Sequence, residues 1–194
     1  MRLRSGGVAS KIGDMRPPER IVLDPDLLLR RLTPEDASAA HRAVAESFEI
    51  LHPWMPWAAE WPKPADQEAF VASSISEWES GTSYVYGIFD AGDAAWVGTV
   101  GLHARVGPGA FEIGYWLHTD HTGKGMATRA ARALSEVALA LPGVDRVEIR
   151  CDEANTSSRA IPERLGFRLD RIEEHTPDAP GESGRRMIWI KDET

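Results

Sequence analysis

The chain has 194 residues, of which 42% are hydrophobic and 27% charged, and its formal net charge is −8. This length fits one domain that buries enough apolar surface to fold without disulfides. No run of 18 apolar residues occurs, so the sequence predicts no membrane span, and the basic N-terminus lacks the apolar stretch of a secretory signal. Cys151 is the single cysteine, which excludes an intramolecular disulfide and a multi-cysteine zinc site and suits a reducing, cytoplasmic compartment.

The charge is unevenly distributed along the chain. Residues 1–20 hold five basic and two acidic residues, so the remainder carries 17 basic and 28 acidic residues. An acidic body argues against nucleic acid as a partner and attracts cationic substrates over long range. An acidic surface also serves solubility alone, so both interpretations stay open. We expect neither a nucleic acid nor a membrane as a partner.

The N-terminal part of the chain predicts a flexible extension followed by the folded domain. Residues 1–25 are rich in Gly, Pro and Arg and show no periodicity, so the domain is expected to span 26–194. The apolar run Leu27–Leu32 predicts the first strand. Thr33 as N-cap, followed by proline and two acids, then predicts a helix that runs to about Ala45.

The rest of the chain alternates between strand-like and helix-like patterns. The prolines of the segment 48–57 preclude a regular helix there. The later elements are expected to be a helix over Ala65–Ser80, strands over Tyr84–Phe89, Trp96–Ala104 and Phe111–His118, a helix over Ala127–Leu141, a strand over Val147–Cys151, a helix over Asn155–Leu165, and strands over Phe167–Glu173 and Met187–Ile190. This order predicts an α+β fold whose mixed, mostly antiparallel sheet has six to seven strands and helices on both faces. The strand–helix–strand unit over 111–151 is expected to be a parallel crossover.

The segment Thr122–Ala127 carries the most chemical information, because it follows a strand and opens a helix. Gly123 and Gly125 allow a positive φ and a close approach of the backbone to a ligand. The amides of the first helical turn then form a cradle for a pyrophosphate, with Lys124 and Arg129 adding charge at its rim. The spacing fits neither a P-loop nor a dinucleotide fingerprint. A tight strand-to-helix turn without a ligand is the alternative interpretation.

This segment resembles the acetyl-CoA loop of the GNAT acetyltransferases, Q/R-x-x-G-x-G/A. Gly125 and Ala127 match the pattern, whereas Thr122 stands in the Q/R position and departs from it. The preceding segment 111–117 resembles the strand of this family whose backbone pairs with the pantetheine arm of the cofactor. The order of these two segments agrees with the family.

Two further segments strengthen the resemblance. Asn155 to Ser158, followed by the L-G-F sequence over 165–167, resembles the family's N-x-x-S … L-G-F signature. The segment 53–57, Pro-Trp-Met-Pro-Trp, resembles that of the RimJ/RimL branch, which acetylates the N-termini of ribosomal proteins. The resemblance covers 27–190 and implies acetyl-CoA as cosubstrate. The residues it implies for cofactor binding are Tyr115, Trp116, Leu117, Thr122, Gly123, Lys124, Gly125, Met126, Ala127, Thr128, Asn155 and Ser158.

Two residues are candidates for catalysis. Glu112 shares a strand face with Trp116, and burial there would raise its pKa so that it could accept a proton from the amine, directly or through water. Alternatively, Glu112 is a surface residue or an ion-pair partner. Ser158 lies in a first helical turn, where its hydroxyl could stabilise the leaving thiolate, or it simply faces solvent. Asn155 is a helix N-cap, a role compatible with cofactor contact.

The acceptor amine is expected to bind near the early tryptophans. His52, Trp54 and Trp57 could line its pocket, or the tryptophans close the core beneath an irregular loop. His118 and His121 lack a third ligand at metal spacing, so no metal is predicted.

The predicted function is acetylation of a primary amine. An α-amine has a pKa of about 7.7–8.0 against about 10.4 for lysine, so it is more nucleophilic at neutral pH, which favours a protein N-terminus. A small amine (an amino acid, polyamine or antibiotic), a non-catalytic acyl-CoA sensor and a different phosphate-binding fold remain alternatives. The strand over 187–190, as a sheet edge, could support a homodimer.

Overall fold

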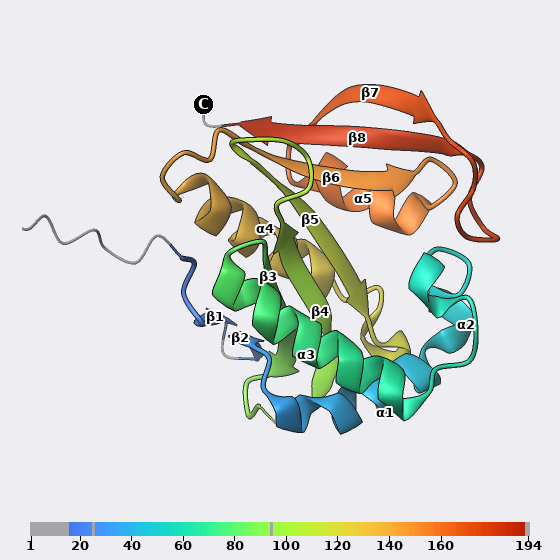
Figure 1. Ribbon diagram of the computed structural model, residues 1–194. Helices are drawn as coiled ribbons and strands as arrows, with labels where there is room; N and C mark the ends of the chain where they lie inside the picture. The colour runs from blue at the N-terminus through green and yellow to red at the C-terminus, as the bar shows by residue number, and fades with distance from the viewer. Residues whose placement is uncertain (1–15, 25, 94, 193–194) are drawn as a thin grey trace, which may run out of the picture.

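The computed structural model describes residues 16–24, 26–93 and 95–192. Within these residues the chain forms one sheet of eight strands in the order β1-β2-β3-β4-β5-β6-β8-β7, antiparallel except between β5 and β6 (Figure 1). The strands are β1 Arg20–Asp24, β2 Leu27–Arg31, β3 Ser83–Asp90, β4 Trp96–His103, β5 Ala110–Leu117, β6 Arg146–Asp152, β7 Arg168–Glu174 and β8 Arg185–Asp192. The predicted α+β class and the parallel β5–β6 pair are confirmed.

Five α-helices surround the sheet in the described part of the chain. They are α1 Ala37–Glu46, α2 Phe48–Leu51, α3 Pro64–Ser80, α4 Met126–Leu139 and α5 Thr156–Arg164, with short 3-10 helices at Pro34–Asp36, Pro56–Ala58 and Thr119–His121. None of these helices combines the length and the apolar character needed to cross a bilayer.

The two faces of the sheet have separate cores (Figure 1). On one face, Ala40 of α1 and Val71 of α3 pack against Val85 of β3. On the other face, Leu134 of α4 packs with Ile113 of β5. One face of α4 is apolar, as a helical periodicity predicts. Ala130, Ala131, Leu134 and Ala138 on this face are buried, and Ala127 is half-buried. Burial on both faces fixes the register of the central strands.

The folded domain begins earlier in the chain than the sequence predicts. Arg20–Asp24 forms β1, which pairs antiparallel with β2 and brings the sheet to eight strands instead of six to seven. Ile21 pairs with Leu29 and packs against the core, and Tyr86 Oη donates to the carbonyl of Pro18 at 2.8 Å. The predicted extension 1–25 therefore includes part of the sheet, and its first 15 residues lie outside the described ones.

Two local predictions are also corrected. The segment 48–57 contains one helical turn, α2, because the helix is complete before Pro53 and only the later residues are affected by the prolines. The strand over 187–190 is not a sheet edge, because β8 lies between β6 and β7. Met187 pairs with Cys151 on one side and Ile172 on the other, so this strand offers no edge for a homodimer.

Candidate active site

The sheet opens where β5 and β6 separate. The two parallel strands pair at Ala110–Arg146, Phe111–Val147 and Glu112–Glu148. Beyond Glu112, β5 continues along β4 to Leu117 and β6 continues along β8. The facing backbone groups of the two strands are therefore left without their sheet partners, and such groups bind a ligand readily.

A cleft of about 710 Å³ passes through this opening. Its size is that of a small-molecule site. Aromatic side chains from the early loop and α3 form one wall, and polar residues of β6, α5 and the β7–β8 loop form the other. The lining includes Trp54, Trp57, Gln67, Phe70, Gly101, His103, Arg105, Glu112, Gly114, Tyr115, Trp116, Arg150, Cys151, Asp152, Asn155, Ser158, Glu182 and Arg186.

The glycine loop lies past the end of β5, at the N-terminus of α4. Gly123 and Gly125 have φ values of 73° and 76°. A Cβ added at either position would meet no other atom of the described chain within 4 Å, so the space above the loop is open. The first-turn amides of α4 have no acceptor within the helix, and the helix dipole favours an anion there. These features fit a pyrophosphate group.

Two side chains around this loop, those of Thr122 and Arg129, form contacts within the protein. Thr122 Oγ1 donates to the carbonyl of Thr119 at 2.9 Å, so the residue that departs from the family pattern stabilises the loop from within. Arg129 pairs with Asp26 at 2.8 Å, across to the β1–β2 turn. Lys124 is exposed, and its role at the rim of a phosphate site stays a prediction.

The start of α5 projects into the cleft beside β5. Asn155 Oδ1 accepts from the Ser158 amide at 3.0 Å, so the predicted N-cap is confirmed. Tyr115 Oη lies 3.2 Å from both Ser158 Oγ and the Ser158 carbonyl. Burial raises the pKa of Tyr115, although the Ser158 hydrogen bond acts in the opposite direction, so the phenol is a neutral donor. Burial also raises the pKa of Cys151 to about 11, which keeps that buried thiol protonated.

Glu112 lines the cleft as an ion-pair partner. Its two carboxylate oxygens accept from Arg105 at 2.9 and 2.7 Å. The side chain of Glu112 is 13% exposed and that of Arg105 is 61% exposed, so the carboxylate is largely covered while its partner reaches solvent. Its role as a base remains a prediction.

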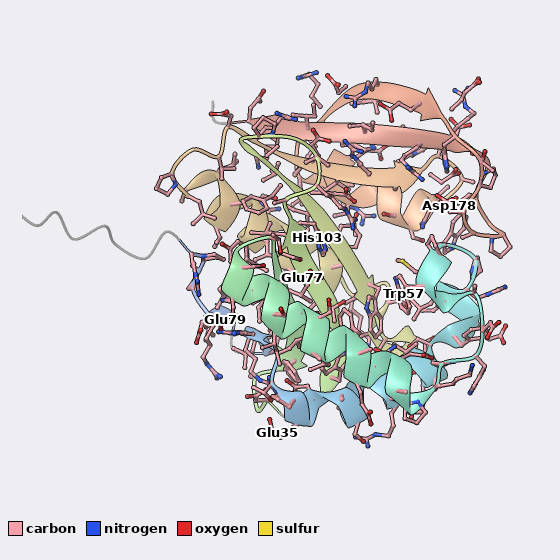
Figure 2. The ribbon with its side chains drawn as sticks, in the orientation of Figure 1. Glu35, Trp57, Glu77, Glu79, His103 and Asp178 are labelled. Carbon is pink, nitrogen blue, oxygen red and sulfur yellow. The ribbon has the colours of Figure 1, made fainter. Side chains whose placement is uncertain are left out.

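His103 is a cleft residue that the sequence did not single out (Figure 2). It lies directly across β4–β5 from Glu112, and its Nδ1 is 2.8 Å from Ser83 Oγ on β3. The alternation of side chains between the two faces of a strand is the pattern that could have identified His103. Gly101 and His103 on β4 lie on the same face of the sheet as Glu112 and Gly114 on β5.

The acceptor side of the cleft gathers the tryptophans but not His52. Trp57 is 51% exposed, and its ring centroid lies 6.1 Å from that of Trp116 (Figure 2). His52 lies outside the described lining, because its Nδ1 hydrogen-bonds the carbonyl of Ala58 at 2.9 Å and its ring stacks on Phe48. The structure therefore brings His52 to the loop that carries the tryptophans, not to the cleft.

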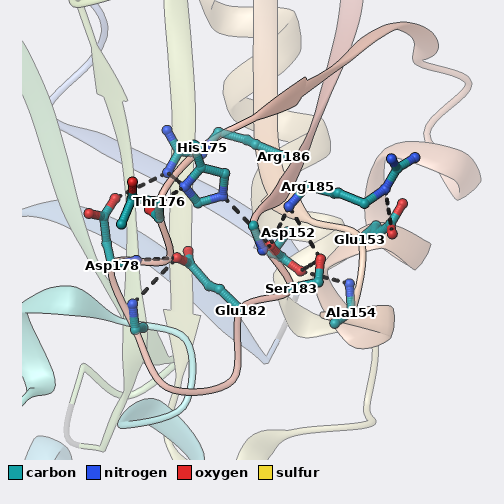
Figure 3. A network of polar contacts seen from close by, with 12 residues as sticks. Asp152, Glu153, Ala154, His175, Thr176, Asp178, Glu182, Ser183, Arg185 and Arg186 are labelled. Atoms are coloured by element: carbon teal, nitrogen blue, oxygen red, sulfur yellow. Dashed lines mark hydrogen bonds and ion pairs between the residues drawn. The ribbon is translucent and has the colours of Figure 1, made fainter.

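The β7–β8 loop is anchored to Asp152, a residue of the cleft lining, by a network of polar contacts (Figure 3). The Asp152 carboxylate accepts from Ala154 N at 2.9 Å, Ser183 Oγ at 2.8 Å and Gly184 N at 3.1 Å. Burial alone would raise the pKa of Asp152, but these hydrogen bonds lower it to about 2. The loop also reaches the early tryptophan segment, because Gly181 N donates to the carbonyl of Pro53 at 2.8 Å.

One group of potential metal ligands lies in the same loop. Atoms of His175, Asp178 and Glu182 lie within 4.8 Å of one another (Figure 3). Asp178, however, pairs with Arg186 at 3.3 Å, and Glu182 accepts from the Asp178 amide at 2.7 Å. Both carboxylates therefore already have partners in the β7–β8 loop or at the start of β8. His118, which the sequence analysis considered as a ligand, contacts Glu46 at 2.8 Å.

Known proteins resemble this chain in sequence and in fold. The model of the acetyltransferase (GNAT) domain matches residues 26–168. The putative ribosomal N-acetyltransferase YdaF of Bacillus subtilis is 34% identical over 146 residues, which cover 73% of this chain and 77% of YdaF. The probable N-acetyltransferase YjcK of the same organism is 34% identical over 97 residues, covering 48% of this chain and 53% of YjcK.

Solved structures share the fold at low sequence identity. RimL, a ribosomal alpha-N-protein acetyltransferase in complex with coenzyme A, has a TM-score of 0.82 at 22% identity, covering 90% of this chain and 98% of RimL. The Microcin C7 self immunity acetyltransferase MccE, in complex with acetyl-CoA and AMP, also has a TM-score of 0.82, at 21% identity, covering 90% of this chain and 97% of MccE.

Proposed function

Because this chain belongs to the GNAT family of N-acetyltransferases, we propose that it transfers the acetyl group of acetyl-CoA to the N-terminal α-amine of a protein, such as a ribosomal protein. The observation that carries the proposal is the cleft through the β5–β6 opening. It connects the strand edge that leads to the α4 N-terminus with an aromatic mouth of the protein.

The donor half of the reaction uses the backbone of β5 and the N-termini of two helices. The first-turn amides of α4, with Lys124, hold the pyrophosphate, and the edge of β5 beyond Glu112 hydrogen-bonds the pantetheine arm. The hydroxyl of Ser158 donates towards the sulfur that leaves, and Tyr115 Oη, 3.2 Å from Ser158 Oγ, supports it. A neutral hydroxyl is a poor acid, so its contribution is to stabilise the developing negative charge.

The acceptor half favours a peptide chain over an isolated amine. A second hollow of about 320 Å³ shares Trp57, Asp66 and Gln67 with the cleft, so it lies next to the cleft, where residues that follow an acceptor's first residue could bind. An α-amine, with a pKa of about 7.7–8.0, is also deprotonated more easily than a lysine side chain. The names of YdaF and RimL agree with this acceptor class.

A small amine is the second candidate acceptor. MccE shares the fold and is complexed with AMP as well as acetyl-CoA, which supports a compact second ligand on this fold. For this chain, an acceptor confined to the 710 Å³ cleft would not need the neighbouring hollow.

The test is a titration with acetyl-CoA by calorimetry, followed by an assay of thiol release. Peptides that begin with Ser or Ala are compared with the same peptides blocked at the N-terminus but carrying an internal lysine, and with a panel of small amines. Release with the free N-termini alone supports the proposal. Release with small amines alone moves the assignment to the second candidate. Binding without any release indicates a sensor, and no binding contradicts the donor assignment.

A further inference from the structure

We propose that His103, oriented by Ser83, accepts the proton that the acceptor amine loses, in place of Glu112. This inference rests on the proposed function, since it concerns the same cleft and the same transfer reaction. It assigns the base to a residue of β4 that no sequence motif marks.

Strand registers place the three residues in one row across the sheet. Ser83 on β3 pairs with His103 on β4, which pairs with Glu112 on β5. A Cβ added at Gly101 would lie 3.0 Å from His103 Nε2, and one added at Gly114 would lie 3.4 Å from it. Because neither neighbour has a side chain, the ring edge that carries Nε2 is left uncovered, and His103 lines the cleft.

The hydrogen bond of the second ring nitrogen is compatible with the tautomer that the proposal requires, because a serine hydroxyl can accept from Nδ1–H. Nδ1 lies 2.8 Å from Ser83 Oγ, and within the described residues His103 has no other hydrogen bond. A neutral imidazole has one N–H and one lone pair. When Nδ1–H donates to Ser83 Oγ, the lone pair is on Nε2, the nitrogen on the cleft side. Ser83 is therefore a positioning residue, and Nε2 is free to accept a proton.

Glu112 is less suited to this role, although it lies next to His103. Both of its carboxylate oxygens accept from Arg105, at 2.9 and 2.7 Å. Protonation of Glu112 would weaken this bidentate, charge-assisted pair, and protonation of His103 Nε2 breaks no existing hydrogen bond.

The surrounding charges keep the imidazole neutral at neutral pH. Burial lowers the pKa of His103 below its ordinary value of 6.5, and the charge of Arg105 lowers it further. Glu77 from α3 (Figure 2) and Glu112 from β5 act in the opposite direction. Arg150 from β6 lines the same cleft. A neutral histidine whose pKa lies somewhat below the working pH is a competent general base.

The transfer step balances with this assignment. The amine nitrogen forms a bond to the acetyl carbonyl carbon while one of its protons moves to His103 Nε2. The carbon–sulfur bond breaks and its electron pair leaves on sulfur, where Ser158 stabilises the charge until solvent supplies a proton. The imidazolium then returns its proton to solvent, so the products are an N-acetylated amine and a free thiol.

The decisive variant is His103→Asn, assayed as kcat against pH with a peptide acceptor. We expect wild-type kcat to fall as pH drops through the pKa of His103, below 6.5. In the variant kcat should be lowered by about 100-fold and this acid limb should be lost, while the Kd of acetyl-CoA stays within about twofold. A variant that keeps the limb, or whose kcat stays within about threefold of wild type, overturns the proposal.

Two further variants separate chemistry from folding. His103→Ala should regain activity when imidazole is added, because the added base can occupy the vacated space in the cleft, whereas a purely structural role would show no rescue. Ser83→Ala should lower kcat by less than the His103 change and shift the acid limb, with KM unchanged. Glu112→Gln, the competing base, should keep the limb. Should wild-type protein release no thiol with any amine, the proposed function itself fails, before any variant is compared.

Discussion

The proposed donor and acceptor sites are built in different ways. The proposed donor site is one short contiguous segment, in which two glycines with positive φ lead into the first turn of α4. At the acceptor end, Trp57, Phe70 and Arg186 come from three distant parts of the chain. The donor end therefore depends on local backbone conformation, and the acceptor end depends on tertiary contacts. Substitutions should affect the two ends separately.

The largest effect is expected from Gly125→Val at the donor end. A β-branched residue at φ 76° is strained, and its side chain would cover the amides that are proposed to bind the pyrophosphate. We expect the Kd of acetyl-CoA to rise by about 100-fold in a calorimetric titration, equivalent to about 2.7 kcal/mol. Gly143→Val is the matched control, because Gly143 has φ 79° and equally open surroundings in the turn after α4. An equal loss of affinity in the control would contradict the donor-site assignment.

Asp152→Asn should lower the free energy of unfolding, because it weakens the hydrogen bonds that hold the β7–β8 loop on the acceptor side of the cleft. The Asp152 side chain is 1% exposed, and its pKa is lowered from 3.8 to about 2 in the folded protein, which stabilises the folded state by about 2 kcal/mol at neutral pH. Because the pKa is depressed, this contribution is complete above about pH 5 and is lost as the pH falls towards 2. Urea unfolding at pH 7 should show the full deficit in the variant, and the difference from wild type should shrink below pH 4. A difference that grows on acidification would refute this account.

Tyr115→Phe tests whether the hydroxyl beside Ser158 acts during turnover. The change removes one donor and keeps the buried ring, so we expect kcat to fall by about tenfold with little change in the KM of acetyl-CoA. Tyr86→Phe is the control, since Tyr86 loses a comparable 2.8 Å hydrogen bond, to Pro18, away from the cleft. If both variants lose the same activity, the effect of Tyr115 is structural.

The smallest effect is expected at the cleft mouth. Trp57→Ala removes a half-exposed ring, and we expect the KM of a peptide acceptor to rise by about fivefold while the Kd of acetyl-CoA is unchanged. His52→Ala, which affects only the loop behind that ring, should raise KM by less. A larger effect from His52 would restore it as an acceptor contact.

The same division explains what the sequence could predict. The α4 loop, the Asn155 cap and the buried face of α4 are patterns of a few neighbouring residues, and the structure confirms the cap and the buried face. The position of β8 between β6 and β7 could not be predicted, because no local sequence pattern specifies the order of strands in a sheet. The sequence pattern does not predict β1, because its five residues follow a Pro-rich segment and its burial depends on pairing with β2.

The residues around the reacting centre were the hardest to predict. Ser83, His103 and Glu112 form one row because of cross-strand register, and without that register His103 is an isolated histidine. The Arg105 pair of Glu112 spans seven residues around a turn, so the sequence alone left open whether that carboxylate was free or paired. Side-chain pairing across strands follows register, which needs the assembled sheet.

The three-residue pairing between β5 and β6 has a consequence for the energetics of the whole chain. It leaves two sub-sheets, β1–β5 and β6-β8-β7, joined at one short seam. A cosubstrate that hydrogen-bonds across the opening would hold the two sub-sheets together. Any ligand that binds only the folded state raises the free energy of unfolding of the protein, by about 2.7 kcal/mol when the ligand is at 100 times its Kd. Thermal stability of this enzyme should therefore rise and fall with the supply of its acyl donor, which couples the lifetime of the folded protein to the acetylation capacity of its surroundings.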